Sequence, residues 1–380
     1  MKRLIVALVV IVLFLLIFTS CSDDSSSEPG NKAPVITSIV SNPATVELGQ
    51  TATVTCTASD ADVDVLTYSW NNTGGTISGS GSSITWTAPD TVGNYSVTCE
   101  VSDGEDSVND GVNISTFETA IPGAMVSVTG GTFTMTDPSK QTYVTVTVSD
   151  FSIGKYEVTQ KEWVDLMGSN PASYDPTNNI GVGDNNPVFH IGWFDILVFC
   201  NQKSMADSLT PCYSINGSTD PDNWGVRPIY SSDPTFAAWN AVICDWDATG
   251  YRMPTEAEWE FAARGGVNWT DDYTYSGSNI IGDVAWYNDN SGSELHIIGT
   301  KLPNQLGIYD MTGNLYEYCW DWYAAYTDNA TDPTGAPTGD MRIVRGGSWM
   351  SIPENCVVNG RYREYPNTNY DYNGFRLVKR

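Results

Sequence analysis

The feature that most constrains the fold is a series of short alternating segments in the first third of the chain. Apolar and polar residues alternate along Thr51–Cys56, Leu66–Trp70 and Asn94–Cys99, and clusters of Asn, Gly and Ser separate these segments. Such alternation is typical of strands that bury one face, and no helical period runs through this part of the chain. We therefore expect residues 33–118 to form an all-β sandwich.

Two cysteines and a tryptophan support this core. Trp70 lies between Cys56 and Cys99 in the sequence, the order found in immunoglobulin-like domains, where the Trp packs on a disulfide between the sheets. We expect an Ig-like sandwich with a Cys56–Cys99 disulfide; the alternative is two unpaired buried thiols. The stretch Tyr95–Gly104 also resembles PKD-type repeats of bacterial surface proteins. The region shows no catalytic or metal-binding pattern, so we expect a spacer or adhesion module.

The first 32 residues predict export rather than a folded element. Two basic residues precede an apolar run, and Phe18–Cys21 resembles a bacterial lipobox. The run is short for a membrane span, so we expect residues 1–20 to be a lipoprotein signal peptide and Cys21 to carry the lipid. The alternative is an ordinary signal peptide that contains a cysteine. Residues 21–32 would be an acidic flexible tether, which places the protein on a bacterial outer membrane, with cell-surface display as a hypothesis.

The charge balance excludes one class of partner. The chain has 45 Asp and Glu against 18 Lys and Arg, for a formal net charge of −27. Clustered cations hold a nucleic-acid backbone, so we expect no nucleic-acid partner. His190 and His296 are the two histidines, too few for a three-histidine zinc or iron centre.

The remainder of the chain, residues 123–380, has a different pattern. Strand-like segments and short helices are separated by loops rich in Gly, Asn, Asp and Trp. Thr159 and Thr255 are each followed three residues later by Glu, the capping-box pattern of a helix start. We expect helices to begin there and a third helix over Phe194–Met205.

Five blocks in this region resemble the sulfatase-modifying-factor family, the formylglycine-generating enzymes. They occur in family order and are Gly154–Thr159, Gly250–Gly266, Leu306–Glu317, Arg345–Trp349 and Gly374–Leu377. The resemblance implies an α+β C-type-lectin-like fold with much irregular structure. Family enzymes oxidise a sulfatase cysteine to formylglycine, using oxygen and Cu(I) held by two cysteines.

The copper site that the resemblance implies is incomplete here. Cys356 occupies the position of the second family cysteine, but Ser351 occupies the first, and Tyr316 stands where an active-site Trp is common. Cu(I) favours two soft thiolates, and a serine hydroxyl is a hard, neutral ligand at pH 7. We therefore expect no Cu(I) site. If the domain is an oxidase, Cys356 and the retained Ser348 are the candidate catalytic residues; otherwise Cys356 is a structural thiol or half of a disulfide.

The other cysteines of this region suggest structural pairs. Cys212 and Cys244 flank a predicted hairpin insertion, and we expect a disulfide between them. Cys319 and Cys356 are a second candidate pair, and Cys200 is the remaining cysteine of this region. Spacing alone does not fix the pairing.

The resemblance also implies a calcium site. Family members bind Ca²⁺ through an Asp-x-x-Gly-Asn-x-x-Glu loop, which here is Asp310–Glu317. Carried over by position, the ligands are the carboxylates of Asp310 and Glu317 and the carbonyls of Gly313 and Leu315. Such hard oxygen ligands suit Ca²⁺. The alternative is that the two carboxylates only stabilise turns.

A segment rich in Tyr and Asn precedes the last block. Tyrosine offers a large contact area at low entropic cost, and small polar residues adapt their hydrogen bonds, as in antibody paratopes. We expect a face that binds an unidentified protein or glycan ligand, formed by Tyr362, Tyr365, Tyr370 and Tyr372. The segment also resembles variable segments of retroelement-diversified lectin-fold proteins; the alternative is an irregular loop that is not diversified.

These expectations combine into one hypothesis. We expect a lipid-anchored cell-surface protein whose sulfatase-modifying-factor-like domain is a ligand-binding or scaffold module. Two alternatives stay open: a divergent formylglycine-generating oxidase that acts on sulfatase cysteines, and a retroelement-diversified binding protein.

Overall fold

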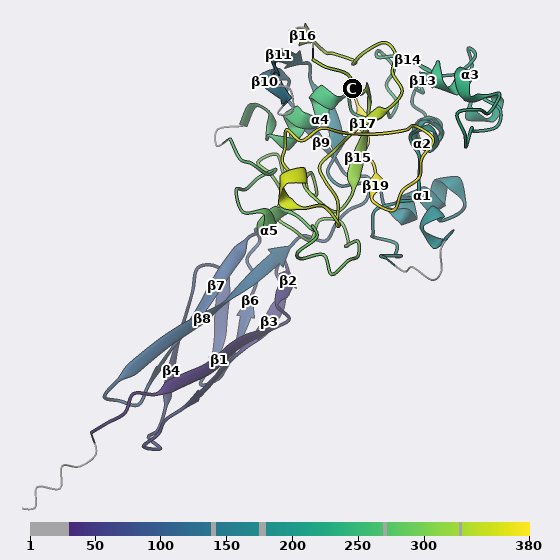
Figure 1. The fold of residues 1–380 in the computed structure, drawn as a ribbon. Helices are drawn as coiled ribbons and strands as arrows, with labels where there is room; N and C mark the ends of the chain where they lie inside the picture. Colours follow the sequence, from purple (N-terminus) through teal and green to yellow (C-terminus); the bar gives the residue numbers. More distant parts are fainter. Residues whose placement is uncertain (1–29, 138–141, 175–179, 269–271, 327–328) are drawn as a thin grey trace, which may run out of the picture.

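The computed structural model describes residues 30–137, 142–174, 180–268, 272–326 and 329–380. An elongated all-β domain is followed by a larger mixed domain (Figure 1). The predicted signal peptide, Cys21 and most of the tether lie outside the described residues. In the described ranges, no helix is both long enough and apolar enough to cross a membrane.

The first domain is a sandwich of two sheets, as the alternation predicted. One sheet has the order β1 (Val35–Asn42), β3 (Thr51–Ser59), β6 (Ser83–Thr87) and β5 (Thr76–Ser80). The other has the order β2 (Thr45–Glu47), β8 (Ser107–Phe117), β7 (Asn94–Ser102) and β4 (Thr67–Asn72). Their inward faces bury Val54, Trp86 and Val97 completely.

Cys56 and Cys99 lie on different sheets and meet in this core. Trp70 packs against both, and its indole Nε1 donates to the Gly81 carbonyl at 2.9 Å. The side chains of Cys56 and Cys99 are hydrogen-bonded to each other, and burial raises the pKa of the Cys99 thiol to about 12. Both are free thiols in the structure, so the Cys56–Cys99 disulfide stays a prediction.

The second domain consists of small sheets and long loops, which confirms the predicted α+β class with much irregular structure. One sheet has the order β20 (Val378–Lys379), β12 (Phe151–Gly154) and β9 (Met125–Val128), and another the order β10 (Gly131–Asp137), β11 (Thr142–Val148) and β16 (Ala330–Thr331). A third has the order β18 (Tyr362–Glu364), β17 (Arg342–Arg345), β15 (Tyr316–Trp322) and β19 (Asn373–Gly374), and β13 (Tyr213–Ser214) pairs with β14 (Ile243–Cys244).

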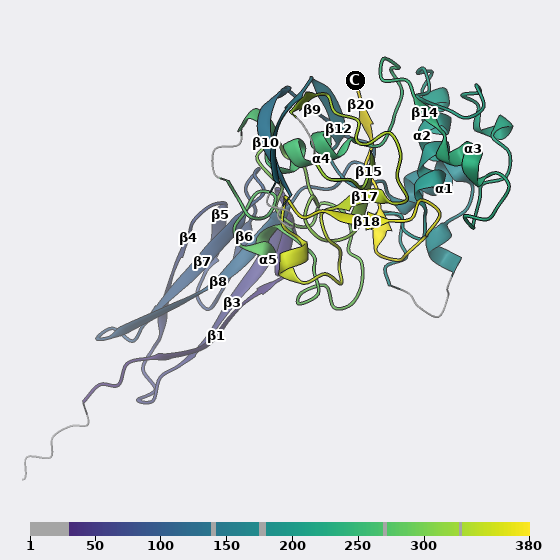
Figure 2. The same cartoon turned by 45° about the horizontal axis from the view of Figure 1, so that its top comes forward.

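The helices begin where the sequence predicted. Thr159 and Thr255 form complete capping boxes at the starts of α1 (Gln160–Met167) and α4 (Glu256–Ala263). The third expected helix is α2 (Trp193–Ala206), and two shorter helices are α3 (Phe236–Asn240) and α5 (Ile281–Val284). In Figure 2, β15, β17 and β18 lie side by side in the middle of this domain.

Helix α4 fixes the position of the sheet that carries the site. Every residue of α4 is buried, and the helix contacts both β15 and β17. Its three glutamates pair with arginines from other segments, so the helix is joined to its neighbours by charge-assisted hydrogen bonds. The pairs are Glu256 with Arg361 (2.7 and 2.8 Å), Glu258 with Arg252 (2.6 Å for both contacts), and Glu260 with Arg345.

Candidate functional site

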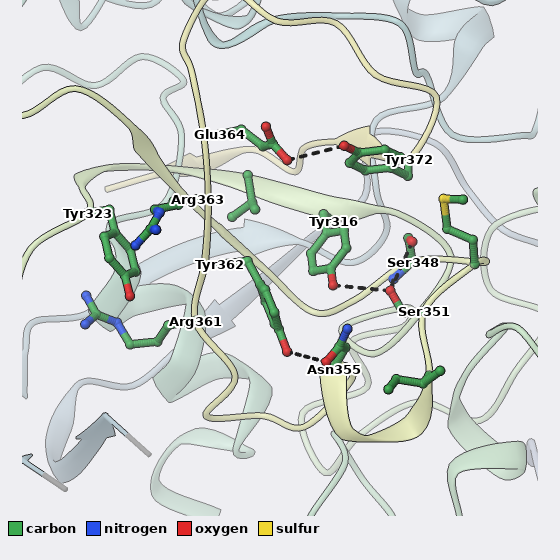
Figure 3. Close-up of a pocket in the computed structure, with 13 residues that line it drawn as sticks. Tyr316, Tyr323, Ser348, Ser351, Asn355, Arg361, Tyr362, Arg363, Glu364 and Tyr372 are labelled. Atoms are coloured by element: carbon green, nitrogen blue, oxygen red, sulfur yellow. Dashed lines mark hydrogen bonds between the residues drawn. The ribbon is translucent and has the colours of Figure 1, made fainter. Parts of the chain in front are cut away.

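A cavity of about 570 Å³ opens beside β15, β17 and β18. Figure 3 shows the rings of Tyr316 and Tyr362 next to each other at its centre. Tyr323 and Arg363 lie on one side, and Ser348 lies with Ser351 on the other. The sheet supplies the tyrosines and the loop after β17 supplies the serines, so the cavity lies where the sequence blocks placed the copper position.

Hydroxyl groups occupy the place of the first family cysteine. Ser351 Oγ donates to the Tyr316 hydroxyl at 3.2 Å and accepts from the Ser348 amide at 3.0 Å. The two serine Oγ atoms are 3.2 Å apart, and both residues are buried. These hydroxyls satisfy one another, and an arrangement of neutral oxygens does not supply the soft ligands that Cu(I) needs.

Cys356 lies beneath this loop and not among the residues that line the cavity. Gly347 has φ +82°, and a Cβ there would lie 2.5 Å from Cys356 Sγ, so the glycine allows the loop to pass over the thiol. Burial raises the pKa of the Cys356 thiol to about 12. The group is therefore protonated at neutral pH and is a poor nucleophile.

The four predicted tyrosines divide into two pairs. Tyr362 and Tyr372 line the cavity, whereas Tyr365 and Tyr370 are exposed and outside its lining. Tyr362 donates to Asn355 Oδ1 at 2.8 Å, and the ring of Tyr370 stacks on that of Tyr372 with centroids 4.9 Å apart.

Sequence reasoning missed part of the cavity wall. In the sequence, Tyr316 was noted only because it replaces the family Trp. In the structure its ring meets that of Tyr362 edge-on, with ring centroids 5.1 Å apart. Arg363 lies over the ring of Tyr323 at 4.7 Å. The alternation of Tyr362, Arg363 and Glu364 along β18 was a signal for a strand, but nothing in the sequence placed that strand beside β17.

The two expected calcium-binding carboxylates lie in different surroundings. Glu317 accepts two hydrogen bonds from Arg376 (2.6 and 2.7 Å) and one from Trp259 Nε1 (2.6 Å). Its carboxylate is therefore paired with an internal cation, and its role as a calcium ligand stays a prediction. Asp310 is better suited than Glu317 to be a calcium ligand, because its Oδ1 is buried with no hydrogen-bond partner among the described residues. Calcium binding by this loop stays a prediction.

The same loop is held by a carboxylate that sequence reasoning did not single out. Glu157 accepts from Asn314 Nδ2 at 2.8 Å and from the Leu315 amide at 3.1 Å. A side chain from outside the loop between Asp310 and Glu317 thus helps to hold its backbone in place. Burial, reinforced by Asp310 and Glu317, raises the pKa of Glu157 well above its usual range.

The other cysteines of the domain are buried free thiols. Cys200, Cys212 and Cys244 share one core, so the predicted Cys212–Cys244 disulfide has Cys200 as a neighbouring competitor. Cys319 packs in a different core cluster, which includes Trp259. The structure brings the first three thiols together and leaves the pairing a prediction.

Comparison with known proteins decides the family. Residues 113–380 match the model of the sulfatase-modifying factor enzyme 1-like domain, and residues 37–116 match the PKD domain model. The chain belongs to the sulfatase-modifying factor enzyme 1-like family. The match confirms the resemblance seen in the five sequence blocks and the Ig-like or PKD-like character of the first domain.

Individual relatives of this sulfatase-modifying factor-like protein differ in how much they share with it. It is 37% identical over 274 residues to Chaperone protein LppX of Paenibacillus barcinonensis, which covers 67% of this chain and 87% of LppX. It is 33% identical over 158 residues to the formylglycine-generating enzyme of Streptomyces coelicolor, covering 37% of this chain and 50% of that enzyme. The chain therefore spans half the length of this enzyme.

A solved structure shares the fold over the whole second domain. Treponema denticola variable protein 1 is 33% identical, with a TM-score of 0.61, and the match covers 69% of this chain and 98% of that protein.

Proposed function

We propose that the sulfatase-modifying-factor-like domain is a ligand-binding module whose binding face surrounds the tyrosine-lined cavity. One observation carries this proposal: Ser351 occupies the first copper position and faces a cavity walled by Tyr316, Tyr362 and Tyr372. The remaining cysteine, Cys356, is buried and is not among the residues that line that cavity. The place that serves metal chemistry in family enzymes is here an aromatic recess.

The arrangement suits recognition because its large side chains are held before a ligand arrives. Tyr362 is fixed by its bond to Asn355, and Tyr372 donates to Glu364 at 3.4 Å. Side chains that are already ordered lose little entropy on binding. Aromatic rings supply contact area, while Arg363 and Glu364 at the wall supply charged hydrogen-bond partners of both signs.

We further propose that a lipid on Cys21 anchors the protein to the outer membrane and that the PKD-like sandwich holds the binding domain away from the bilayer. The export pattern of residues 1–20 supports this proposal. A Cys21→Ser variant should move from the membrane fraction to the soluble fraction. Retention in the membrane would contradict it.

The similarity to LppX, whose name describes a chaperone protein, supports a protein as the ligand.

A second candidate function follows from the similarity to Treponema denticola variable protein 1. In that case the C-terminal segment is diversified and binds varying ligands. A near-identical template copy of this segment beside the gene, differing at adenines, would support diversification, and its absence from a complete genome would contradict it.

The binding face can be tested on an array of surface proteins and glycans. We expect the full mature protein to bind at least one ligand, and a Tyr362→Ala/Tyr372→Ala double variant to lose at least about tenfold in affinity, the usual effect of removing central aromatic contacts. Tyr143→Ala, an exposed tyrosine on β11, is the matched control. Equal loss in the control, or unchanged binding by the folded double variant, would contradict the assigned face.

A further inference from the structure

Arg342, the first residue of β17, is buried between aromatic rings. The residue is 1% exposed, and its guanidinium carbon lies 3.6 Å from the ring centroid of Trp193 and 3.3 Å from that of Trp322. Nη1 donates to the Trp320 carbonyl at 2.6 Å, while Nε has no hydrogen-bond partner among the described residues. The guanidinium is therefore fixed in orientation and incompletely satisfied.

The other buried arginines of this domain differ from Arg342 in their ion-pair partners. Each of them is paired with a glutamate, whereas Arg342 makes no salt bridge within the described part of the chain; the pairs are Arg252 with Glu258, Arg345 with Glu260, and Arg376 with Glu317. Burial lowers the pKa of Arg342 well below its usual range, although Asp321 acts in the opposite direction. An arginine nevertheless stays charged in proteins, and a buried charge without a counter-ion is costly. A bound anion would remove that cost.

Arg342 lines a second cavity, of about 720 Å³, which shares no lining residue with the tyrosine-lined cavity. Trp246, Trp320 and Trp322 form its aromatic wall, and the rings of Trp246 and Trp320 meet at 89° to make a corner. Among the described residues, Arg342 is the only charged one in the lining, although acidic residues outnumber basic ones 45 to 18 in the whole chain. An anion would meet no carboxylate on the wall.

The cavity is accessible from outside. Its rim includes Ala241, Ile243 and Thr338, all exposed. Figures 1 and 2 show β14 and α3, which border it, on the side of the second domain away from the sandwich. A ligand could enter there without competing with the tyrosine-lined face.

We propose that this tryptophan-lined cavity is a second binding site, which takes a carbohydrate that carries a carboxylate. The carboxylate would accept hydrogen bonds from the guanidinium edge of Arg342, the geometry in which arginine recognises carboxylates most specifically. The sugar ring would pack its apolar C–H face against Trp246 and Trp320, whose indole rings combine a large flat surface with limited flexibility. A neutral sugar would leave Arg342 without a counter-ion, and a small anion would leave the corner unfilled.

The test measures the binding of glucuronic acid, used as the probe, to the full mature protein by isothermal titration calorimetry. We expect glucuronic acid to bind and to do so at least about tenfold more tightly than glucose or acetate. Two variants of the exposed rim residue test the sign of the charge: Thr338→Glu and Thr338→Gln. Because an added carboxylate repels the ligand across the cavity, the Glu variant should bind glucuronic acid at least about fivefold more weakly than the Gln variant at low salt.

Each result decides between the proposal and its rivals. Equal affinity for glucose would show that Arg342 does not recognise the carboxylate, and equal affinity for acetate would show a simple anion site; either overturns the proposal. No heat with millimolar glucuronic acid, or identical behaviour of the two Thr338 variants, overturns it as well. Binding of glucuronic acid that persists in the Tyr362→Ala/Tyr372→Ala variant would support a site separate from the tyrosine-lined face.

Discussion

Ser351 and Tyr316 together replace two features of the family pattern, a cysteine and a tryptophan. Their hydroxyls are hydrogen-bonded at 3.2 Å, a contact that neither family residue could make in this form. A sulfur at position 351 would lie against Tyr316, and the serine hydroxyl would be missing from this hydrogen-bond network. At the scale of single residues, hydroxyl groups therefore line this part of the cavity.

Asp321 gives a residue-level prediction about pH. It is 5% exposed, accepts from the Glu256 amide at 2.8 Å, and burial raises its pKa to about 7. The folded protein thus binds a proton that the unfolded chain releases near pH 4. Stability contributed by this group is complete below about pH 4 and falls as pH rises to about 7, by on the order of 4 kcal/mol.

An Asp321→Asn variant keeps an oxygen for the Glu256 amide and removes the charge. We expect its denaturation midpoint to fall less than that of the natural protein between pH 5 and pH 8. Chemical denaturation at both pH values measures this difference. Parallel pH profiles for the two proteins would show that Asp321 is not the buried acid described here.

The individual cavity residues show the limits of sequence reasoning. Tyr362 and Tyr372 were predicted because composition identifies tyrosine-rich segments as contact surfaces. Tyr365 and Tyr370 share that composition but are exposed outside the cavity, since composition does not say which side of a loop a ring occupies.

Among the elements, helix α4 combines a local capping box with ion pairs to distant segments. Its start was predictable, because Thr255 and Glu258 are three residues apart and form a capping box. Its role was not, because Glu256 and Glu260 pair with arginines 105 and 85 residues away. Sequence reasoning likewise found α2 from its apolar run but did not find that Trp193 stacks on Arg342.

The buried pair at the start of α4 gives a prediction at this scale. Glu258 makes two 2.6 Å bonds to Arg252, and both side chains are buried. Glu258→Gln leaves a buried guanidinium without its counter-ion, and we expect a loss of about 3–5 kcal/mol of unfolding free energy.

The matched control is the exposed pair in α1, Lys161 with Asp165, at 2.9 Å. Asp165→Asn should leave the unfolding free energy almost unchanged, because water screens exposed pairs. Urea denaturation of both variants compares them. Similar losses would mean that burial does not set the strength of the α4 pair.

At the scale of the whole molecule, the all-β domain and the larger mixed domain are in direct contact. Lys155 forms a 2.9 Å salt bridge with Glu118, and Asn94 Nδ2 donates to Asp283 at 3.5 Å. The order of the domains was predictable from the change in periodicity near residue 120. The packing of the second domain was not, because its strands are short and its register depends on contacts between distant segments.

The sandwich gives a prediction about oxidation. Cys56 and Cys99 face each other in its core, and protein oxidised under export conditions should contain the disulfide. Closing this loop should add on the order of 4 kcal/mol to the stability of the sandwich. Peptide mapping after alkylation without reductant checks the bond, and a lower denaturation midpoint after reduction checks its effect. Alkylation of both cysteines without reductant would contradict the prediction.

The central claim is that the second domain binds a ligand and does not act as a copper oxidase. The most direct measurement supplies the mature protein with Cu(I), oxygen and a sulfatase-type cysteine peptide, and detects the aldehyde product by mass spectrometry. Ser351→Cys and the formylglycine-generating enzyme of Streptomyces coelicolor are assayed in parallel. We expect product from the reference enzyme and none from the natural protein. Aldehyde formed by the natural protein at a rate dependent on Cys356 would contradict it.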